Sequence, residues 1–184
     1  TDGATVLNLT NHAYWNLSGH DTGSALDHHL RLWASRWLPT DPSLVPTGEL
    51  QAVAGTPMDF TMPQVIGSRI EADCDALRYG KGYDNCWVID GAENVMRCAA
   101  ELYDPKSGRV MTVATDQPAV QVYTGNWLDD SPMGKGAYKY HDYAGVAIEC
   151  QNFPDAPNHP SFPTSVLRRG ERYDRTISFA FSVR

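Results

Sequence analysis

The sequence lacks any concentration of positive charge, and this absence excludes one class of partner. Its 22 acidic residues outnumber its 15 lysines and arginines, which gives a formal net charge of −7. Because no basic stripe offsets this charge, nucleic acid is not an expected partner. Apolar runs long enough to cross a membrane are also missing, so the sequence predicts no membrane partner either.

Motifs that bind nucleotide phosphates or present a nucleophilic serine are also absent. There is no G-x-G-x-x-G after a strand, no G-x-x-x-x-G-K-[ST] and no G-x-S-x-G elbow. His141, Asp155 and His159 are residue types that bind metals, but their spacing matches no standard site. The sequence therefore predicts no metal site and contains no standard phosphate-binding loop.

Cysteines are few and are not arranged as a C-x-x-C motif. The four are Cys74, Cys86, Cys98 and Cys150, and three of them lie in strand-like apolar runs. We expect free, buried thiols and hence a reducing compartment, which favours the cytoplasm.

Long amphipathic helical patterns are missing, and short alternating runs take their place. These runs cover 5–10, 29–34, 86–90, 96–103, 109–115, 119–124, 145–151 and 176–183. Pro105 and Gly108 between two of them indicate a hairpin turn. Only a short helical turn is expected, at 71–77, and the His28-His29 pair looks like a solvated strand start. The pattern predicts an all-β, mostly antiparallel sandwich in a single domain.

Glu149 places a charge on an apolar strand. With a period of two, Val146 and Ile148 share one face, while Ala147 and Glu149 share the other. The small residues Gly145 and Ala147 predict open space beside the carboxylate, which a ligand would fill. The alternative is a glutamate that points outward into solvent.

His12 lies in a segment whose polar residues alternate. If the segment is extended, Asn8, Thr10, His12 and Tyr14 point one way, and Trp15 points the other way toward the core. A polar face centred on histidine suits a hydroxyl-rich ligand and proton transfer near neutral pH. The alternative is a wet outer face with an incidental histidine.

Two further polar residues occur at strand positions. Asp84 follows a Gly-rich turn, where its carboxylate either accepts hydroxyl hydrogen bonds from a ligand or caps the turn. Gln121 stands between Val120 and Val122, and is either a ligand contact or a surface glutamine.

Several ordered motifs together resemble the aldose 1-epimerases, also called galactose mutarotases. They are Asn11-His12-x-Tyr14-Trp15-Asn16-Leu17, Gly82-Tyr83-Asp84, Gln121-Val122-Tyr123-Thr124-Gly125-Asn126, Glu149-x-Gln151-x-x-Pro154-Asp155-Ala156-x-Asn158 and Arg168-x-Gly170-Glu171-x-Tyr173. The resemblance covers essentially the whole chain. It implies a β-supersandwich of the galactose mutarotase type and cofactor-free interconversion of the α and β anomers of free hexoses such as galactose and glucose.

Residue by residue, the resemblance implies that His12 is the general acid and Glu149 the general base. It also implies that Asp84 and Gln121 bind the sugar hydroxyls. Asn85 departs from the family, which often has histidine after the aspartate.

The family's earlier half, with an Asn/Arg strand and a His-Gly-Gly-like segment, has no counterpart here. Residues 1–184 are therefore expected to be the C-terminal portion of one galactose mutarotase-like domain, which would pair with the missing half or form a homo-oligomer. Other possibilities are a non-catalytic carbohydrate-binding or sensory domain on the same fold, and an inactive fragment. Phosphorylated hexoses are less expected as substrates, because little lysine or arginine accompanies His12 and Glu149.

Overall fold

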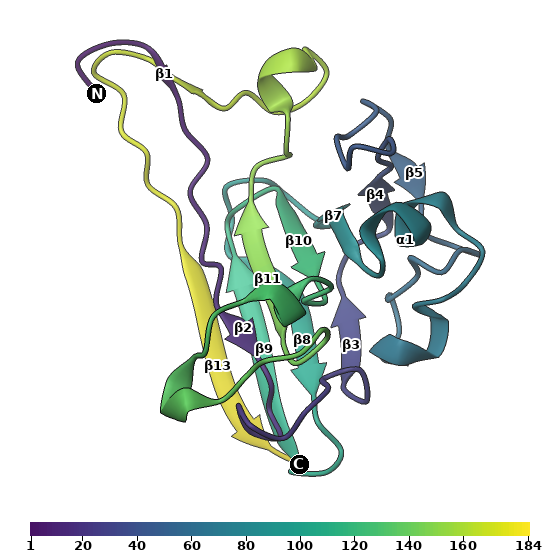
Figure 1. Cartoon of the computed structure of the whole chain (residues 1–184). Coiled ribbons are helices and arrows are strands. Elements are labelled where there is room, and N and C mark those ends of the chain that lie inside the picture. Colours follow the sequence, from purple (N-terminus) through teal and green to yellow (C-terminus); the bar gives the residue numbers. More distant parts are fainter.

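The computed structural model describes all of residues 1–184, which form three antiparallel sheets (Figure 1). In spatial order, the six-stranded sheet contains β2 (Tyr14–Trp15), β11 (Val146–Gln151), β10 (Ala119–Tyr123), β7 (Asp84–Val88), β4 (Arg36–Leu38) and β5 (Gln51–Ala52). The five-stranded sheet contains β13 (Ile177–Val183), β9 (Arg109–Thr115), β8 (Arg97–Tyr103), β3 (His29–Leu32) and β6 (Gln64–Val65). A two-stranded ribbon joins β1 (Thr5–Val6) to β12 (Val166–Leu167) near the N-terminus.

Helical structure is limited to short elements. α1 spans Asp75–Gly80, and the 3₁₀ turns are η1 (Ile66–Arg69), η2 (Leu128–Asp130), η3 (Lys135–Ala137) and η4 (Ala156–Asn158). None of these is long and apolar enough to cross a membrane.

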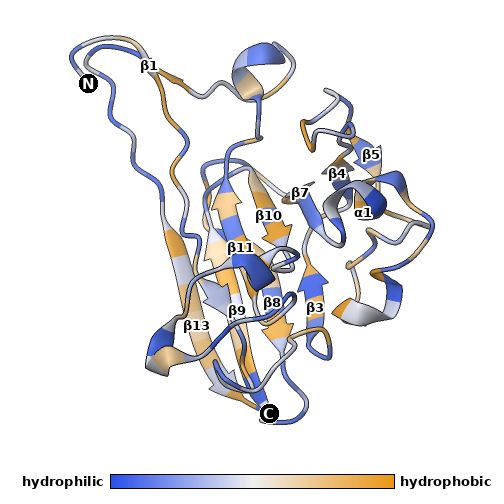
Figure 2. Ribbon diagram, viewed as in Figure 1, coloured by the Kyte–Doolittle hydropathy of each residue, from blue (hydrophilic) through white to orange (hydrophobic).

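The hydrophobic core lies between the two large sheets. Hydrophobic and hydrophilic residues alternate along the central strands (Figure 2). The six-stranded sheet contributes Trp87, Val146 and Ile148 to the core, and the five-stranded sheet contributes Leu30 and Leu102. This arrangement confirms the predicted all-β antiparallel sandwich, since each sheet buries alternate residues against the other.

Most predicted strands are present, with one informative exception. β9 and the turn containing Gly108, whose φ is 74°, agree with the prediction. The run 5–10 does not, because only Thr5–Val6 is a strand. The helical turn also lies a few residues later than expected, at Asp75–Gly80.

The cysteine prediction is correct in part. All four thiols are free, and Cys86 and Cys150 are buried. Cys98 is exposed and Cys74 is partly exposed, so burial was wrongly expected for both. The pairing of β8 with β9 shifts register between Cys98 and Ala100, and this bulge buries Ala99 and Ala100 while Cys98 stays outside.

The expectation of a solvated pair at His28-His29 is wrong for His28. This residue is only 1% exposed, and its Nε2 atom accepts a 2.9 Å hydrogen bond from the Leu17 N–H. Burial lowers the pKa of His28, since a charged imidazole would lose its hydration there. His28 therefore anchors the chain just after β2 from inside the sandwich.

Candidate active site

Three of the four predicted site residues lie on neighbouring strands of the six-stranded sheet. Gln121 on β10 is directly opposite Glu149 on β11, and Tyr123 on β10 is opposite Asp84 on β7. Because side chains alternate along a strand, these residues project from one face, while Val146, Ile148 and Cys150 enter the core as predicted. The sheet thus presents two carboxylates and an amide on its face away from the core.

Glu149 is not a solvated surface glutamate. Its side chain is only 8% exposed, and its Oε1 atom is 3.3 Å from Nε2 of His12. Burial raises the pKa of Glu149, the charge of His12 opposes that rise, and Asp84 adds to it. A carboxylate with a raised pKa is a stronger base than one in water.

The open space predicted beside Glu149 is partly filled. A Cβ atom on Gly145 would lie 3.1 Å from the Cβ atom of Tyr14, and Ala147 pairs directly with Tyr14 across the β2–β11 ladder. The small residues Gly145, just before β11, and Ala147, on β11, therefore admit the neighbouring strand β2, which the local sequence pattern could not reveal.

His12 approaches Glu149 from a segment that is not a strand. Asn8 forms two hydrogen bonds with the backbone of Asn152, and Thr10 Oγ1 donates to the carbonyl of Cys150 at 2.9 Å. Asn8, Thr10 and His12 do face the same way, as predicted. However, Asn8 and Thr10 bind the end of β11 rather than standing free for a ligand.

Asp84 and Gln121 are joined by a hydrogen bond. Gln121 Nε2 donates to Asp84 Oδ1 at 2.8 Å, whereas Gln121 Oε1 is buried and has no partner. Burial raises the pKa of Asp84, and the bond from Gln121 opposes that rise. The carboxylate of Asp84 therefore bonds across the sheet and does not cap its own turn.

Two tyrosines complete the cluster: Tyr14, which the sequence placed on the same face as His12, and Tyr123, which was not singled out from the sequence. The His12 ring centroid is 5.2 Å from that of Tyr14 and 6.4 Å from that of Tyr123. Burial raises the pKa of both phenols, so both are neutral at neutral pH. The period of two that placed Gln121 also places Tyr123 on its face, which was the available signal.

Other residues considered from sequence lie away from this cluster. Trp15 packs against Phe179 and Phe181, on the core side as predicted. Asn85 is fully buried on that side too, since it pairs with the core residue Val122.

The three potential metal ligands are divided between two ion pairs. His141 contacts Asp129, and His159 contacts Asp155. No group of three histidine, cysteine or acidic side chains comes together in a way that would hold a metal.

The geometry thus joins a partly exposed imidazole to a buried carboxylate, above a hydrogen-bonding pair that suits hydroxyl groups. A sequence model of the family described as aldose 1-epimerase matches residues 1–180. The chain belongs to the aldose 1-epimerase family.

Related members of the aldose 1-epimerase family agree along almost all of this chain. The galactose mutarotase of Homo sapiens is 41% identical over 180 residues, which are 98% of this chain and 51% of the relative. The aldose 1-epimerase of Escherichia coli (strain K12) is 36% identical over 177 residues, which are 95% of this chain and 50% of the relative. The chain therefore spans about half the length of these relatives.

Solved aldose 1-epimerase structures support the fold. An aldose epimerase homologue from C. elegans superposes with a TM-score of 0.84 at 30% identity, covering 98% of this chain and 52% of the other. Galactose 1-epimerase from Lactobacillus acidophilus NCFM gives a TM-score of 0.77 at 26% identity, covering all of this chain and 51% of the other. These matches confirm the predicted galactose mutarotase type of sandwich.

Proposed function

We propose that the protein interconverts the α and β anomers of free hexoses such as galactose and glucose. The observation that carries this proposal is the contact between the buried Glu149 and His12, above the Asp84–Gln121 pair. Anomer exchange needs a base and an acid at one acetal-like centre, and these two side chains offer both.

In the proposed mechanism, Glu149 takes the proton from the C1 hydroxyl while His12 protonates the ring oxygen. The C1–O5 bond breaks, the C1–C2 bond rotates, and the reverse transfers close the ring on the other face. In this cycle Glu149 starts as the proton acceptor and His12 as the proton donor, and their side chains lie 3.3 Å apart. Each proton transfer contributes about 10²–10⁴ in rate.

Asp84 and Gln121 are proposed to hold the sugar. Asp84 has acceptor sites beyond the one that Gln121 occupies, and the Gln121 amide orients that carboxylate toward the sugar hydroxyls. Strands β2, β11, β10 and β7 carry no lysine or arginine. Free hexoses are therefore favoured over phosphorylated ones, because a phosphate would find no cation there.

We also propose that residues 1–184 are the C-terminal portion of a single galactose mutarotase-like domain. The half-length coverage of the relatives supports this organisation. So does β13 at the edge of its sheet, where Phe181 is 60% and Val183 74% exposed. The partner proposed for this edge is the remaining half of the sandwich, and a second copy of the chain is the alternative.

The free cysteines favour a reducing compartment, and we propose the cytoplasm as the site of action. No cofactor enters the proposed reaction, which needs only proton transfers. The expected partner is the sugar alone, apart from the polypeptide that would pair with β13.

Polarimetry of freshly dissolved α-galactose tests the proposed reaction. Glu149→Gln is expected to lower the catalysed rate by about 10²–10⁴, because the amide cannot accept the C1 proton. Glu101→Gln is a matched control, since Glu101 pairs with Arg184 on the other sheet. Full activity in Glu149→Gln would exclude this mechanism.

The same assay separates the other possibilities. Calorimetric binding of galactose without faster anomerisation would indicate a carbohydrate-binding or sensory domain. Neither binding nor activity from the chain alone, with both appearing when the other half of the sandwich is supplied, would support the proposed domain organisation.

A further inference from the structure

The segment that carries His12 has an unusual attachment to the rest of the protein. No backbone–backbone hydrogen bond involves residues 8–13, although the backbone is bonded at Leu7 before the segment and in the β2–β11 ladder after it. Between these two fixed ends, side-chain hydrogen bonds hold the segment to the rest of the protein.

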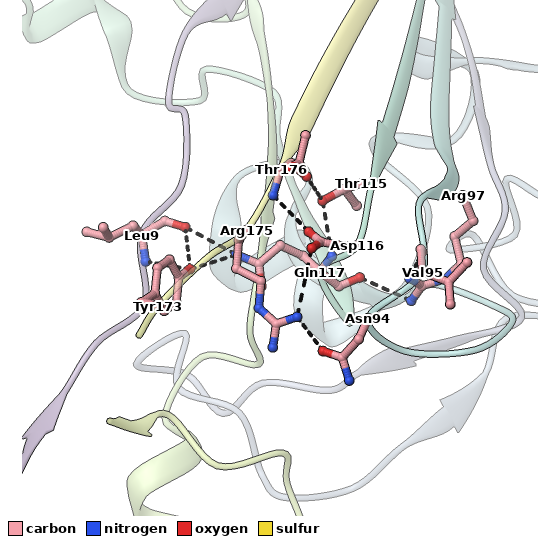
Figure 3. Close-up of polar contacts among 10 residues, drawn as sticks. All are labelled: Leu9, Asn94, Val95, Arg97, Thr115, Asp116, Gln117, Tyr173, Arg175 and Thr176. Atoms are coloured by element: carbon pink, nitrogen blue, oxygen red, sulfur yellow. Dashed lines mark hydrogen bonds and ion pairs between the residues drawn. The ribbon is translucent and has the colours of Figure 1, made fainter. Parts of the chain in front are cut away.

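Figure 3 shows Leu9 together with Tyr173 and Gln117, two residues outside the His12 segment. The hydroxyl of Tyr173 accepts a hydrogen bond from the Leu9 N–H at 3.4 Å and lies 3.3 Å from the Leu9 carbonyl, to which it donates. Gln117 Nε2 donates to the Tyr173 hydroxyl at 2.8 Å and to the Leu9 carbonyl at 3.4 Å. Both backbone polar groups of Leu9 are thus bound by Tyr173 and Gln117.

Gln117 is itself held firmly. It is only 2% exposed, and its N–H donates to Thr115 Oγ1 at 3.1 Å. Its carbonyl accepts a 3.1 Å hydrogen bond from the guanidinium of Arg97. Thr115 Oγ1 in turn donates to the carbonyl of Thr176, close to Tyr173 in the chain. The turn between β9 and β10 therefore provides a fixed platform for Leu9.

We propose that Tyr173 and Gln117 are positioning residues that keep His12 against Glu149 by fixing the backbone at Leu9. This inference rests on the proposed function, in which His12 acts as the acid. Asn8 also bonds Asn152 before Leu9, but between Leu9 and His12 the only other anchor to the sheet is the Thr10 hydroxyl. Loss of the Leu9 contacts therefore lets the segment move away from β11 and lengthens the 3.3 Å contact between His12 and Glu149.

Tyr173→Phe tests this role, because it removes the hydroxyl and keeps the ring. We expect kcat for galactose mutarotation to fall about 10- to 100-fold with little change in KM, since the acid is displaced while Asp84 and Gln121 are untouched. Tyr79→Phe is the control, since the Tyr79 hydroxyl forms no hydrogen bond and lies on α1. Its kinetics should match those of the unaltered protein.

A second readout does not depend on activity. The charge of His12 lowers the pKa of Glu149, so displacement of His12 is expected to raise that pKa further. Carbon-detected NMR titration of the Glu149 carboxyl measures it in the unaltered protein, Tyr173→Phe and Tyr79→Phe. Gln117→Met, which removes the amide that bridges Tyr173 and Leu9, should produce the same upward shift.

The outcomes separate the two proposals. An unchanged Glu149 titration in folded Tyr173→Phe and Gln117→Met would overturn the positioning role, even if both variants melt at lower temperature. If the protein has no mutarotase activity even when the other half of the sandwich is supplied, the proposed function fails, and the titration still decides whether Tyr173 and Gln117 position His12.

Discussion

The two sides of the candidate site are held in place by different means. On one side, Asp84, Gln121 and Glu149 belong to adjacent strands whose backbones form continuous ladders. On the other side, His12 belongs to a segment without any backbone–backbone hydrogen bond. A ladder shares its hydrogen bonds among many residues, whereas each side-chain anchor contributes about 1 kcal/mol on its own. Single substitutions should therefore displace the imidazole much more easily than the carboxylates.

The largest expected effect comes from removing the imidazole of the His12–Glu149 pair. His12→Gln should lower kcat for galactose mutarotation by about 10²–10⁴, because no proton donor then serves the ring oxygen. The pKa of Glu149 should rise, since the charge that lowers it is lost. Polarimetry and NMR titration measure the two effects, and His20→Gln, on a separate contact with Tyr140, is the control. A normal rate in His12→Gln would remove this residue from the mechanism.

A smaller effect is expected on the ladder side. Gln121→Leu should weaken galactose binding by about 10-fold, because hydrogen bonds to charged groups contribute roughly 1.5–3 kcal/mol. The pKa of Asp84 should rise, since Gln121 donates to its ionised form. Calorimetry and carboxyl titration provide the measurements. The titration of Glu149 should move little, and a large movement would show that the ladder side is less rigid than its pairing suggests.

Thr10→Val weakens the attachment of the His12 segment without touching the ladder. The variant loses the 2.9 Å hydrogen bond to the Cys150 carbonyl, and the free energy of unfolding should fall by about 1 kcal/mol. Urea denaturation measures this change. Thr112→Val on β9, whose hydroxyl forms no side-chain hydrogen bond, is the matched control. Equal losses in both variants would argue that the Thr10 hydroxyl does not anchor the segment.

The smallest expected effect is a pH-dependent change in the free energy of unfolding. It involves His28, which contacts Leu17 on the C-terminal side of the His12 segment. His28 accepts a hydrogen bond from Leu17, and burial lowers its pKa below the ordinary value of about 6.5. The unfolded chain therefore binds this proton more readily, so stability is retained above about pH 7 and falls as the pH drops below about 6.5. Urea denaturation between about pH 7 and pH 5 measures the slope.

His28→Gln should flatten that slope. Asp104 does not account for a change in stability between about pH 7 and pH 5. Burial would raise its pKa, but hydrogen bonds from Ser18, Ser107 and Lys106 outweigh burial and lower that pKa to about 2. Its contribution is therefore lost only in stronger acid. An unchanged slope in His28→Gln would assign the pH dependence to another group.

The sequence predicted the paired strands that carry Gln121 and Glu149 better than the segment that carries His12. Strand β9 and the two faces of β11 follow from alternation, which is a local property of the chain. The contact between His12 and Glu149 required the family resemblance, because nothing local relates residues so far apart in sequence. Alternation also placed His12 on the same side as Asn8 and Thr10, but it could not show that these two side chains bind β11.

The wrong predictions share a physical cause. Gly145 predicted open space, which Tyr14 partly fills from the neighbouring strand. His28 looked solvated, although the chain around Leu17 covers it. Cys98 looked buried, but a bulge next to it changes which residues face the core. In each case a distant segment or an irregular pairing decides the outcome, and a local pattern contains neither.

The two-residue strand β2 connects the candidate site to the edge strand β13. Tyr14 touches the imidazole of His12, while its neighbour Trp15 touches Phe179 and Phe181 on β13. A polypeptide that adds to the edge strand β13 would therefore lie close to a dipeptide that also contacts His12. Tyr14 and Trp15 thus form a short bridge between the two faces of the six-stranded sheet.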